Sequence, residues 1–288
     1  MKDLITIGKR KIGINEPTFV IGELSCNHRQ DYDLAVKTVH AMNEAGVDCV
    51  KLQTAKPESL TIDSDKEDFI IKGGTLWDNR KLFDLYQDVY TPWEWHERLQ
   101  KLVESLGMEF FSSPFDFKAV DFLADLNVPA YKIASFEITD IPLIKYTASK
   151  GKPIIMSTGI ATEQEIQEAV DACIGEGNDQ VILLKCTSAY PTPWEEVNLN
   201  AIDTLQSRYK CLAGISDHTI GDIVPLGSVT KGARVIEKHF ILDRNLGGPD
   251  SKFSMEPQEF KTMIERVRIL EKCLGKPELE LSEKVKKS

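Results

Sequence analysis

Short apolar runs recur at regular intervals along the chain, and amphipathic segments separate them. The runs expected to form strands are residues 18–22, 48–53, 108–111, 130–134, 153–156, 181–186, 212–215 and 234–238. They are continuous rather than alternating, which is typical of parallel strands that are covered on both faces. Eight strand–helix units in roughly 270 residues predict an α/β fold of the (β/α)8 TIM barrel type.

A doubly wound sheet is the alternative fold, but it normally carries a glycine-rich phosphate turn after its first strand. Here the first strand runs into Glu23 and the sequence LSCNH instead. Residues 55–91 interrupt the regular spacing, and this largely polar stretch is expected to form a lid or wall of a site rather than a separate domain. We therefore assign residues 1–275 to a single barrel domain.

Composition narrows the class of protein. With 42% hydrophobic and 28% charged residues, the chain is typical of soluble globular proteins. No apolar run approaches the roughly 18 residues of a membrane span, and a net charge of −10 without a basic stripe argues against nucleic-acid binding. Six cysteines without a CxxC pair indicate reduced thiols in a cytoplasmic protein, not a disulfide framework or zinc ribbon.

Polar residues follow nearly every predicted strand. In a (β/α)8 barrel the carboxyl ends of the strands converge on one rim, which carries the chemistry. The residues at these ends are Glu23, Lys51, Gln53, Ser113, Lys132, Ser135, Glu137, Ser157, Thr187, Ser188, Ser216, His218 and His239, with Lys185 as a further ammonium group. Together they predict a funnel lined by two or three lysines, many small hydroxyls and two carboxylates.

A histidine follows each of the last two predicted strands. His218 and His239 lie 21 positions apart, just past neighbouring parallel strands, so both imidazoles could reach one ion. Such a pair with oxygen ligands suits a divalent ion that orients or polarises a carbonyl oxygen. The alternative is one packed and one surface histidine. Asp217 and Glu237 each precede a histidine closely, and strand alternation is expected to point them away from the funnel.

The lysines and hydroxyls suit a phosphate group. Lys51 and Lys132 are the candidate cations, and the candidate hydrogen-bond donors are Ser135, Ser157 and Ser216. Each serine has the alternative role of capping a local turn or helix. Glu23 would ligate the ion or orient a water molecule near it. Asp250, in a loop after the last strand, would contact the substrate or the ion, or form a turn.

Nine ordered motifs resemble the sialic acid synthase family: GELSCNH, KLQT, FFSSPFD, YKIASFEITDIPLIKY, IIMSTGI, LLKCTSAYPTP, GISDHT, VIEKHF and GGPDS. The KIASFEITD, FFSSPFD and CTSAYPTP segments are most similar to its pseudaminic acid synthase branch. The resemblance spans nearly the whole chain. It implies a metal-dependent condensation of phosphoenolpyruvate with an open-chain N-acetylated amino sugar, which gives a nonulosonic acid and releases phosphate by C–O cleavage.

The resemblance also implies roles for individual residues. Phosphoenolpyruvate would be held by Lys51, Ser113, Lys132, Ser135, Ser157, Ser188 and Ser216. His218 and His239 would hold Mn²⁺ or Mg²⁺, and Glu23 would position the attacking water. Glu137, Tyr190 and Asp250 would contact the sugar. This branch implies 2,4-diacetamido-2,4,6-trideoxy-altrose as the sugar and pseudaminic acid as the product, with N-acetylneuraminate and legionaminate synthesis as alternatives.

The sequence departs from the sialic acid branch at Ser188 and Ser113, where that branch has asparagine and threonine. The family continues into a small antifreeze-like domain that completes the partner's site in a homodimer. Residues 276–288 are expected to begin the linker to that domain, and the domain itself is expected to be missing.

Other functions fit the same residues. One is a Schiff-base aldolase that uses Lys132 or Lys185 as the amine, and another is a non-catalytic sugar-phosphate sensor. A metal-dependent amidohydrolase normally has an HxH pair after the first strand, where this chain has Asn27 and His28.

Overall fold

The computed structural model describes residues 1–72, 77–275, 279 and 286. In this part of the chain, eight parallel strands close into one barrel in the order β10-β3-β4-β5-β6-β7-β8-β9. The strands are β3 (Phe19–Glu23), β4 (Cys49–Thr54), β5 (Glu109–Pro114), β6 (Tyr131–Ile133), β7 (Ile154–Ser157), β8 (Val181–Cys186), β9 (Leu212–Asp217) and β10 (Val235–His239). Their ends differ from the predicted ends by at most three residues, and the predicted (β/α)8 fold is confirmed.

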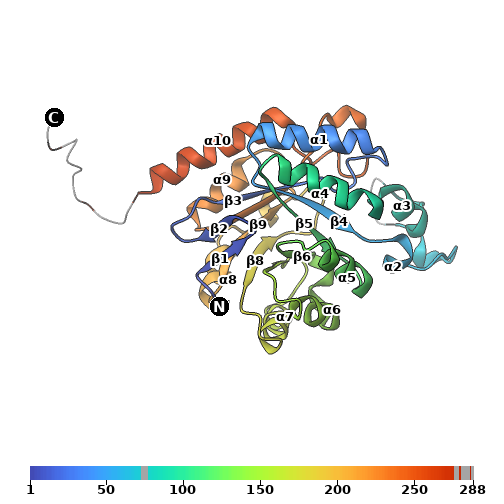
Figure 1. The fold of residues 1–288 in the computed structure, drawn as a ribbon, viewed down its shortest axis with the longest axis horizontal. Coiled ribbons are helices and arrows are strands. Elements are labelled where there is room, and N and C mark those ends of the chain that lie inside the picture. The colour runs from blue at the N-terminus through green and yellow to red at the C-terminus, as the bar shows by residue number, and fades with distance from the viewer. Residues whose placement is uncertain (73–76, 276–278, 280–285, 287–288) are drawn as a thin grey trace.

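Helices surround the barrel (Figure 1). They are α1 (Tyr32–Ala45), α4 (His96–Ser105), α5 (Phe117–Asp125), α6 (Ile141–Ala148), α7 (Glu163–Gly175), α8 (Ala201–Tyr209), α9 (Ile223–Thr230) and α10 (Pro257–Leu274). Helix α10 packs beside α1, so the last helix completes the ring that the first one begins (Figure 1). A capping box opens α7, since the Thr162 N–H donates to Glu165 Oε2 over 2.7 Å and the Glu165 N–H donates to Thr162 Oγ1.

The core consists of two clusters of buried side chains. The larger one contains residues of all eight barrel strands except the part of β6 to β9 that faces α6, α7 and α8, and it joins them to α1, α4 and α10. The other joins β7, β8 and β9 to α6, α7 and α8. The six cysteines are free thiols, and all except Cys273 are buried. No helix in residues 1–72 or 77–275 combines the length and apolar character needed to cross a bilayer.

An N-terminal hairpin precedes the barrel and was not predicted. Its strands, β1 (Leu4–Ile7) and β2 (Arg10–Gly13), pair antiparallel. The hairpin lies at the amino-terminal end of the barrel, because the Lys9 N–H donates to Glu109 Oε1 over 2.7 Å at the start of β5. Buried Ile5, Ile7 and Ile12 face the core there, so the hairpin closes the end opposite to the strand carboxyl ends.

The segment between β4 and α4 contains α2 (Pro57–Leu60), a 3-10 turn η1 (Glu67–Phe69) and α3 (Leu82–Val89), which lie beyond the end of β4 in Figure 1. Further 3-10 turns are η2 (Trp93–Trp95), η3 (Ser135–Thr139), η4 (Trp194–Glu196) and η5 (Arg244–Leu246). The predicted linker, residues 276–288, falls outside the described residues except for positions 279 and 286.

Candidate active site

A cavity of about 460 Å³ opens at the carboxyl ends of the barrel strands. Twelve of the thirteen predicted site residues line it: Glu23, Lys51, Ser113, Lys132, Ser135, Ser157, Ser188, Tyr190, Ser216, His218, His239 and Asp250. These residues come from positions that span most of the chain. They lie together because every barrel strand ends at the same rim. Described residues of segment 55–91 contribute one wall of the cavity.

A buried charge network forms the floor of the cavity. The ammonium group of Lys51 lies 2.9 Å from Glu23 Oε2 and 3.2 Å from Glu237 Oε2. The ammonium group of Lys132 lies 3.4 Å from Glu237 Oε1. All four side chains are at most 3% exposed. Two cations and two carboxylates are thus held out of bulk water, where their electrostatic interactions are strong.

The position of Glu237 corrects the prediction that it points away from the funnel. In the barrel Glu237 pairs with Ser216 of β9, and the Ser216 hydroxyl donates to Glu237 Oε1 over 2.9 Å. Glu237 stands two positions before His239, so strand alternation places both on the inner face. Asp217 stands one position before His218 and does point away, as expected.

Burial and neighbouring charges together shift the pKa values of these groups. Burial alone would raise the pKa of Glu23, but Lys51 and His239 outweigh it and hold the pKa well below its usual range. Burial would lower the pKa of Lys51, but Glu23 and Glu237 together raise it. For Lys132 burial prevails and lowers the pKa, against the opposing effect of Glu237. Glu23 is therefore ionised, and Glu237 helps Lys132 keep its proton.

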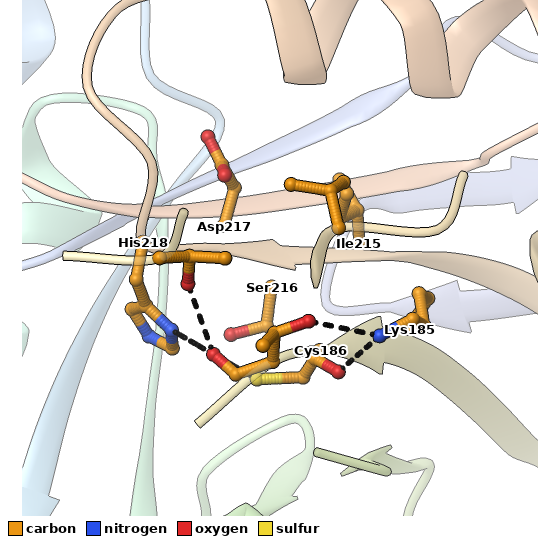
Figure 2. Close-up of a pocket in the computed structure, with 9 residues that line it drawn as sticks. Lys185, Cys186, Ile215, Ser216, Asp217 and His218 are labelled. Atoms are coloured by element: carbon orange, nitrogen blue, oxygen red, sulfur yellow. Dashed lines mark hydrogen bonds between the residues drawn. The ribbon is translucent and has the colours of Figure 1, made fainter. Parts of the chain in front are cut away.

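The two histidines face each other across the same rim. Their ring centroids are 5.3 Å apart at an interplanar angle of 66°. His239 Nε2 lies 3.3 Å from Glu23 Oε2, and its Nδ1 lies 3.3 Å from Asp250 Oδ2. His218 Nδ1 lies 3.3 Å from the carbonyl oxygen of Thr187 (Figure 2). A carbonyl acceptor on one ring nitrogen fixes the tautomer and leaves the other nitrogen for an ion.

This donor set fits a divalent ion with open coordination positions. The two imidazoles supply nitrogen donors that such ions accept, and the carboxylates of Glu23 and Asp250 lie beside the ring of His239. No group of three or more His, Cys, Asp or Glu side chains among the described residues is arranged to hold an ion by itself. An ion held by the two imidazoles would therefore take its remaining ligands from water or substrate oxygens.

Three serine hydroxyls in the cavity are buried without a hydrogen-bond partner among the described residues: Ser113, Ser157 and Ser188. Unsatisfied buried hydroxyls are costly, so a polar ligand is expected to satisfy them. Ser135 lies beside them and accepts the Gly159 N–H over 3.2 Å. A Cβ at Gly159 would come within 2.4 Å of Ser188 Oγ and 2.8 Å of Ser135 Oγ. The sequence analysis assigned no role to Gly159. A glycine two residues after the end of β7 could have indicated a close approach of the backbone to a ligand.

The upper part of the cavity is aromatic and apolar. The Tyr190 ring lies 4.4 Å from that of His218, and the Phe253 ring lies 4.9 Å from that of His239. Phe253 was not predicted, and its place in the loop after β10 gives no sequence signal. The wall from segment 55–91 carries the side chains of Ile71, Trp77, Leu82, Leu85, Tyr86 and Val89.

Three residues predicted at the funnel do not line the cavity: Glu137, Thr187 and Lys185. Of these, Glu137 is the one for which the resemblance implied a role. Its Oε2 atom is buried and makes no hydrogen bond within the described residues. Burial raises the pKa of Glu137 to about 7, against the lowering effect of Lys132. Burial and Glu137 together raise the pKa of Tyr86 on α3. Glu137 therefore lies at the edge of the site, between the floor and the α3 wall.

Lys185 lies outside the cavity, so the cations on its floor are two lysines and not three. Its ammonium group donates to the Cys186 carbonyl over 2.5 Å and to Thr187 Oγ1 over 3.0 Å (Figure 2). Strand alternation explains this position, because Lys185 precedes the inward-facing Cys186.

The fold and the cavity define the class of protein: a (β/α)8-barrel enzyme whose chemistry lies at the carboxyl ends of its strands. Residues 38–278 match the model of the NeuB family. The chain belongs to the NeuB family, and the resemblance seen in its motifs is confirmed.

The relatives agree with this assignment. The chain is 46% identical to pseudaminic acid synthase from Campylobacter jejuni over 95% of its own length and 80% of that protein. It is 46% identical to pseudaminic acid synthase from Helicobacter pylori over 93% of its own length and 79% of that protein. The crystal structure of N-acetylneuraminic acid synthetase from Leptospira borgpetersenii has a TM-score of 0.89 at 31% identity and covers 100% of this chain and 95% of that one.

Proposed function

We propose that the protein condenses phosphoenolpyruvate with an open-chain N-acetylated amino sugar to give a nonulosonic acid and phosphate, and that the nonulosonic acid is pseudaminic acid. The proposal rests mainly on one observation. Buried serine hydroxyls that have no hydrogen-bond partner among the described residues lie beside two buried lysines in one cavity. The 46% identity to pseudaminic acid synthases supports the choice of product, since identity falls to 38% for a legionaminic acid synthase and 32% for the human N-acetylneuraminate-9-phosphate synthase.

The floor of the cavity would hold phosphoenolpyruvate. Lys51 and Lys132 supply the positive charge, and the hydroxyls of Ser113, Ser135, Ser157, Ser188 and Ser216 supply hydrogen bonds. Donors of this kind bind phosphate and carboxylate oxygens. In a protein with a net charge of −10, these two lysines would supply positive charge at the point where an anionic substrate binds.

Glu23 would orient the attacking water. The carboxylate is held by Lys51 at 2.9 Å and by the Gln53 side-chain amide at 2.8 Å. In the reaction, the electron pair of the C2=C3 double bond of phosphoenolpyruvate forms the bond from C3 to the aldehyde carbon of the sugar, and the water oxygen bonds to C2. The C2–O bond to the phosphoryl group then breaks and C2 becomes a ketone, while the two water protons end on the former aldehyde oxygen, now a hydroxyl, and on the released phosphate. A low pKa keeps Glu23 ionised, so the group is ready to orient the water before attack.

His218 and His239 would hold Mn²⁺ or Mg²⁺. Such an ion supplies a Lewis acid for the aldehyde oxygen of the sugar. Tyr190 and Asp250, which line the cavity, would bind the sugar beside it, and Glu137 would contact the sugar from the edge. The homodimer and the cytoplasmic location stay predictions.

The apolar wall from segment 55–91 favours a sugar with methyl groups. Ile71, Leu82, Leu85 and Val89 offer no hydrogen-bonding side chain to a sugar hydroxyl, and they can bury the methyl groups of acetamido and 6-deoxy positions. A 2,4-diacetamido-2,4,6-trideoxy sugar carries three such groups, whereas N-acetylmannosamine carries one.

The test is phosphate release from phosphoenolpyruvate with Mn²⁺ and a panel of N-acetylated sugars. We expect the diacetamido trideoxy sugar to be the preferred substrate. Absence of phosphate release with every sugar would contradict the reaction, and release with N-acetylmannosamine alone would contradict the product. Borohydride added during turnover distinguishes the aldolase alternative, because only a Schiff base at Lys132 leaves a covalent adduct.

A further inference from the structure

A buried ion pair that is separate from the charge network on the cavity floor lies behind the two histidines. Asp217 precedes His218, and Lys238 precedes His239. The two residues pair across neighbouring strands, since Lys238 of β10 is in register with Asp217 of β9. Their side chains point to the outer face of the barrel, and Figure 2 shows Asp217 on the opposite side of β9 from Ser216. Neither side chain lines the cavity.

The pair is almost completely shielded from water. Lys238 is 0% exposed and Asp217 is 2% exposed in their side chains, and the ammonium group lies 2.5 Å from Asp217 Oδ2. A buried ion pair recovers little net stability, because the cost of removing two charges from water offsets their attraction. A contribution to fold stability is therefore a weak explanation for this pair, and a role in fixing local geometry is a better one.

The contacts of the pair act on the backbone that carries His218. Lys238 donates to the carbonyl oxygen of Thr219 over 2.6 Å, and Asp217 Oδ1 accepts the Thr219 N–H over 2.9 Å. The Thr219 carbonyl is thereby tied directly to β10, and its N–H is tied to Asp217 of β9, which itself pairs with Lys238 of β10. On the other side, the Thr192 N–H donates to the His218 carbonyl oxygen over 3.1 Å. The loop that presents His218 is thus held against β10 by the Asp217–Lys238 pair.

We infer that Asp217 and Lys238 are positioning residues that set the separation of the two imidazoles and, through it, the affinity of the protein for a divalent cation. The inference rests on the proposed function, because it concerns the ion assigned to His218 and His239. Outer groups that orient metal ligands typically change metal affinity by roughly 10- to 100-fold when they are removed. Binding of phosphoenolpyruvate to the lysines and serines does not depend on this pair.

The experiment uses the double variant Asp217→Asn/Lys238→Met, which removes both charges and leaves neither one buried without a partner. Mn²⁺ affinity is measured by electron paramagnetic resonance, and phosphoenolpyruvate affinity is measured on metal-free protein by calorimetry. We expect Mn²⁺ to bind roughly 10- to 100-fold more weakly and phosphoenolpyruvate to bind as in the unsubstituted protein. Excess Mn²⁺ should restore turnover. The single variant Asp217→Asn keeps the side-chain volume and should also bind Mn²⁺ more weakly than the unsubstituted protein. It replaces the double variant in the experiment if the double variant does not fold.

A matched control comes from the opposite end of the barrel. There Asp48 accepts the Val20 N–H over 2.9 Å and pairs with Arg268 at 3.1 Å. The variant Asp48→Asn/Arg268→Met should lower the melting temperature and leave Mn²⁺ affinity unchanged. Equal Mn²⁺ affinity in the unsubstituted protein and in both Asp217 variants would overturn the inference alone. Failure of the unsubstituted protein to bind Mn²⁺ or Mg²⁺ would overturn the metal assignment in the proposed function, and the inference with it.

Discussion

The carboxylate of Glu237 lies 3.2 Å from the ammonium group of Lys51 on the floor of the cavity. The same carboxylate reaches Lys132, so one side chain of the last strand supplies the counter-charge for two candidate substrate-binding lysines. Because burial lowers the pKa of Lys132 and Glu237 opposes that change, the charge of Lys132 depends on Glu237.

The variant Glu237→Gln should make phosphoenolpyruvate binding sensitive to alkaline pH. Without the carboxylate, the pKa of Lys132 falls further, and Lys132 loses its positive charge at a lower pH. A neutral Lys132 loses its charge-assisted hydrogen bond to the anion, which is worth about 1.5–3 kcal/mol, so binding should weaken roughly 10- to 100-fold once the pH exceeds the lowered pKa. The KM for phosphoenolpyruvate, measured from pH 6 to pH 9, should rise with pH earlier than in the unsubstituted protein. Glu97→Gln, which removes an exposed pair with Lys101 on α4, is the control and should leave the profile unchanged. Superimposable profiles for all three proteins would show that Glu237 does not support the charge of Lys132.

The variant Gly159→Ala should damage the phosphate cradle. A methyl group there would collide with Ser188 Oγ at 2.4 Å and Ser135 Oγ at 2.8 Å, so both hydroxyls must move. Loss of one hydrogen bond to a charged group costs about 1.5–3 kcal/mol, which corresponds to an increase of roughly 10- to 100-fold in the KM for phosphoenolpyruvate. The KM for the sugar should change little. Gly175→Ala is the matched control, since a methyl group there meets no atom within 4 Å. A normal KM for phosphoenolpyruvate in Gly159→Ala would mean that the serines do not bind this substrate.

The barrel strands could be predicted because each is a continuous apolar run between helix signals, and that pattern does not depend on distant residues. The N-terminal hairpin could not be predicted in the same way. Its strands have four residues each, and Leu4 is half exposed, so the local pattern is weak. What stabilises the hairpin is the packing of Ile5, Ile7 and Ile12 against the barrel, which is a tertiary effect.

The site residues at the strand ends could be predicted because the barrel topology alone brings strand ends together. The orientation of Glu237 was predicted wrongly, since residues 237 and 239 share one face of β10 and only residue 238 lies on the other. Phe253 lies in the loop after β10, and most of the apolar wall lies on α3 in the long segment between β4 and α4. Their positions depend on how these segments pack over the rim, which no local pattern determines.

The variant Glu137→Gln should change the pH dependence of stability. Burial raises the folded-state pKa of Glu137 to about 7, above the usual value of 4.5. A group of this kind stabilises the fold below its unfolded pKa and loses that contribution as the pH rises through the folded pKa. The glutamine variant has no such loss. Its free energy of unfolding relative to the unsubstituted protein should therefore increase between pH 4.5 and pH 7, by up to about 3 kcal/mol.

Urea unfolding at pH 5 and pH 8 measures this difference for Glu137→Gln. Glu168→Gln, on the exposed face of α7, is the control and should show no change between the two pH values. A constant difference between Glu137→Gln and the unsubstituted protein at both pH values would show that Glu137 is not protonated more readily in the folded state.

The variant Val89→Thr should shift the sugar preference. Val89 contributes to the apolar wall, and threonine keeps its shape while it replaces a methyl group with a hydroxyl. If the wall buries the methyl groups of a diacetamido trideoxy sugar, the hydroxyl lowers kcat/KM for that sugar by roughly 10-fold and favours N-acetylmannosamine, which carries a hydroxyl at C6. The ratio of the two kcat/KM values measures the shift. Val36→Thr makes the same substitution at a partly buried position of α1, away from the cavity, and should leave the ratio unchanged. An unchanged ratio in Val89→Thr as well would mean that the α3 wall does not contact the sugar, and the choice of a methyl-rich substrate would lose its structural support.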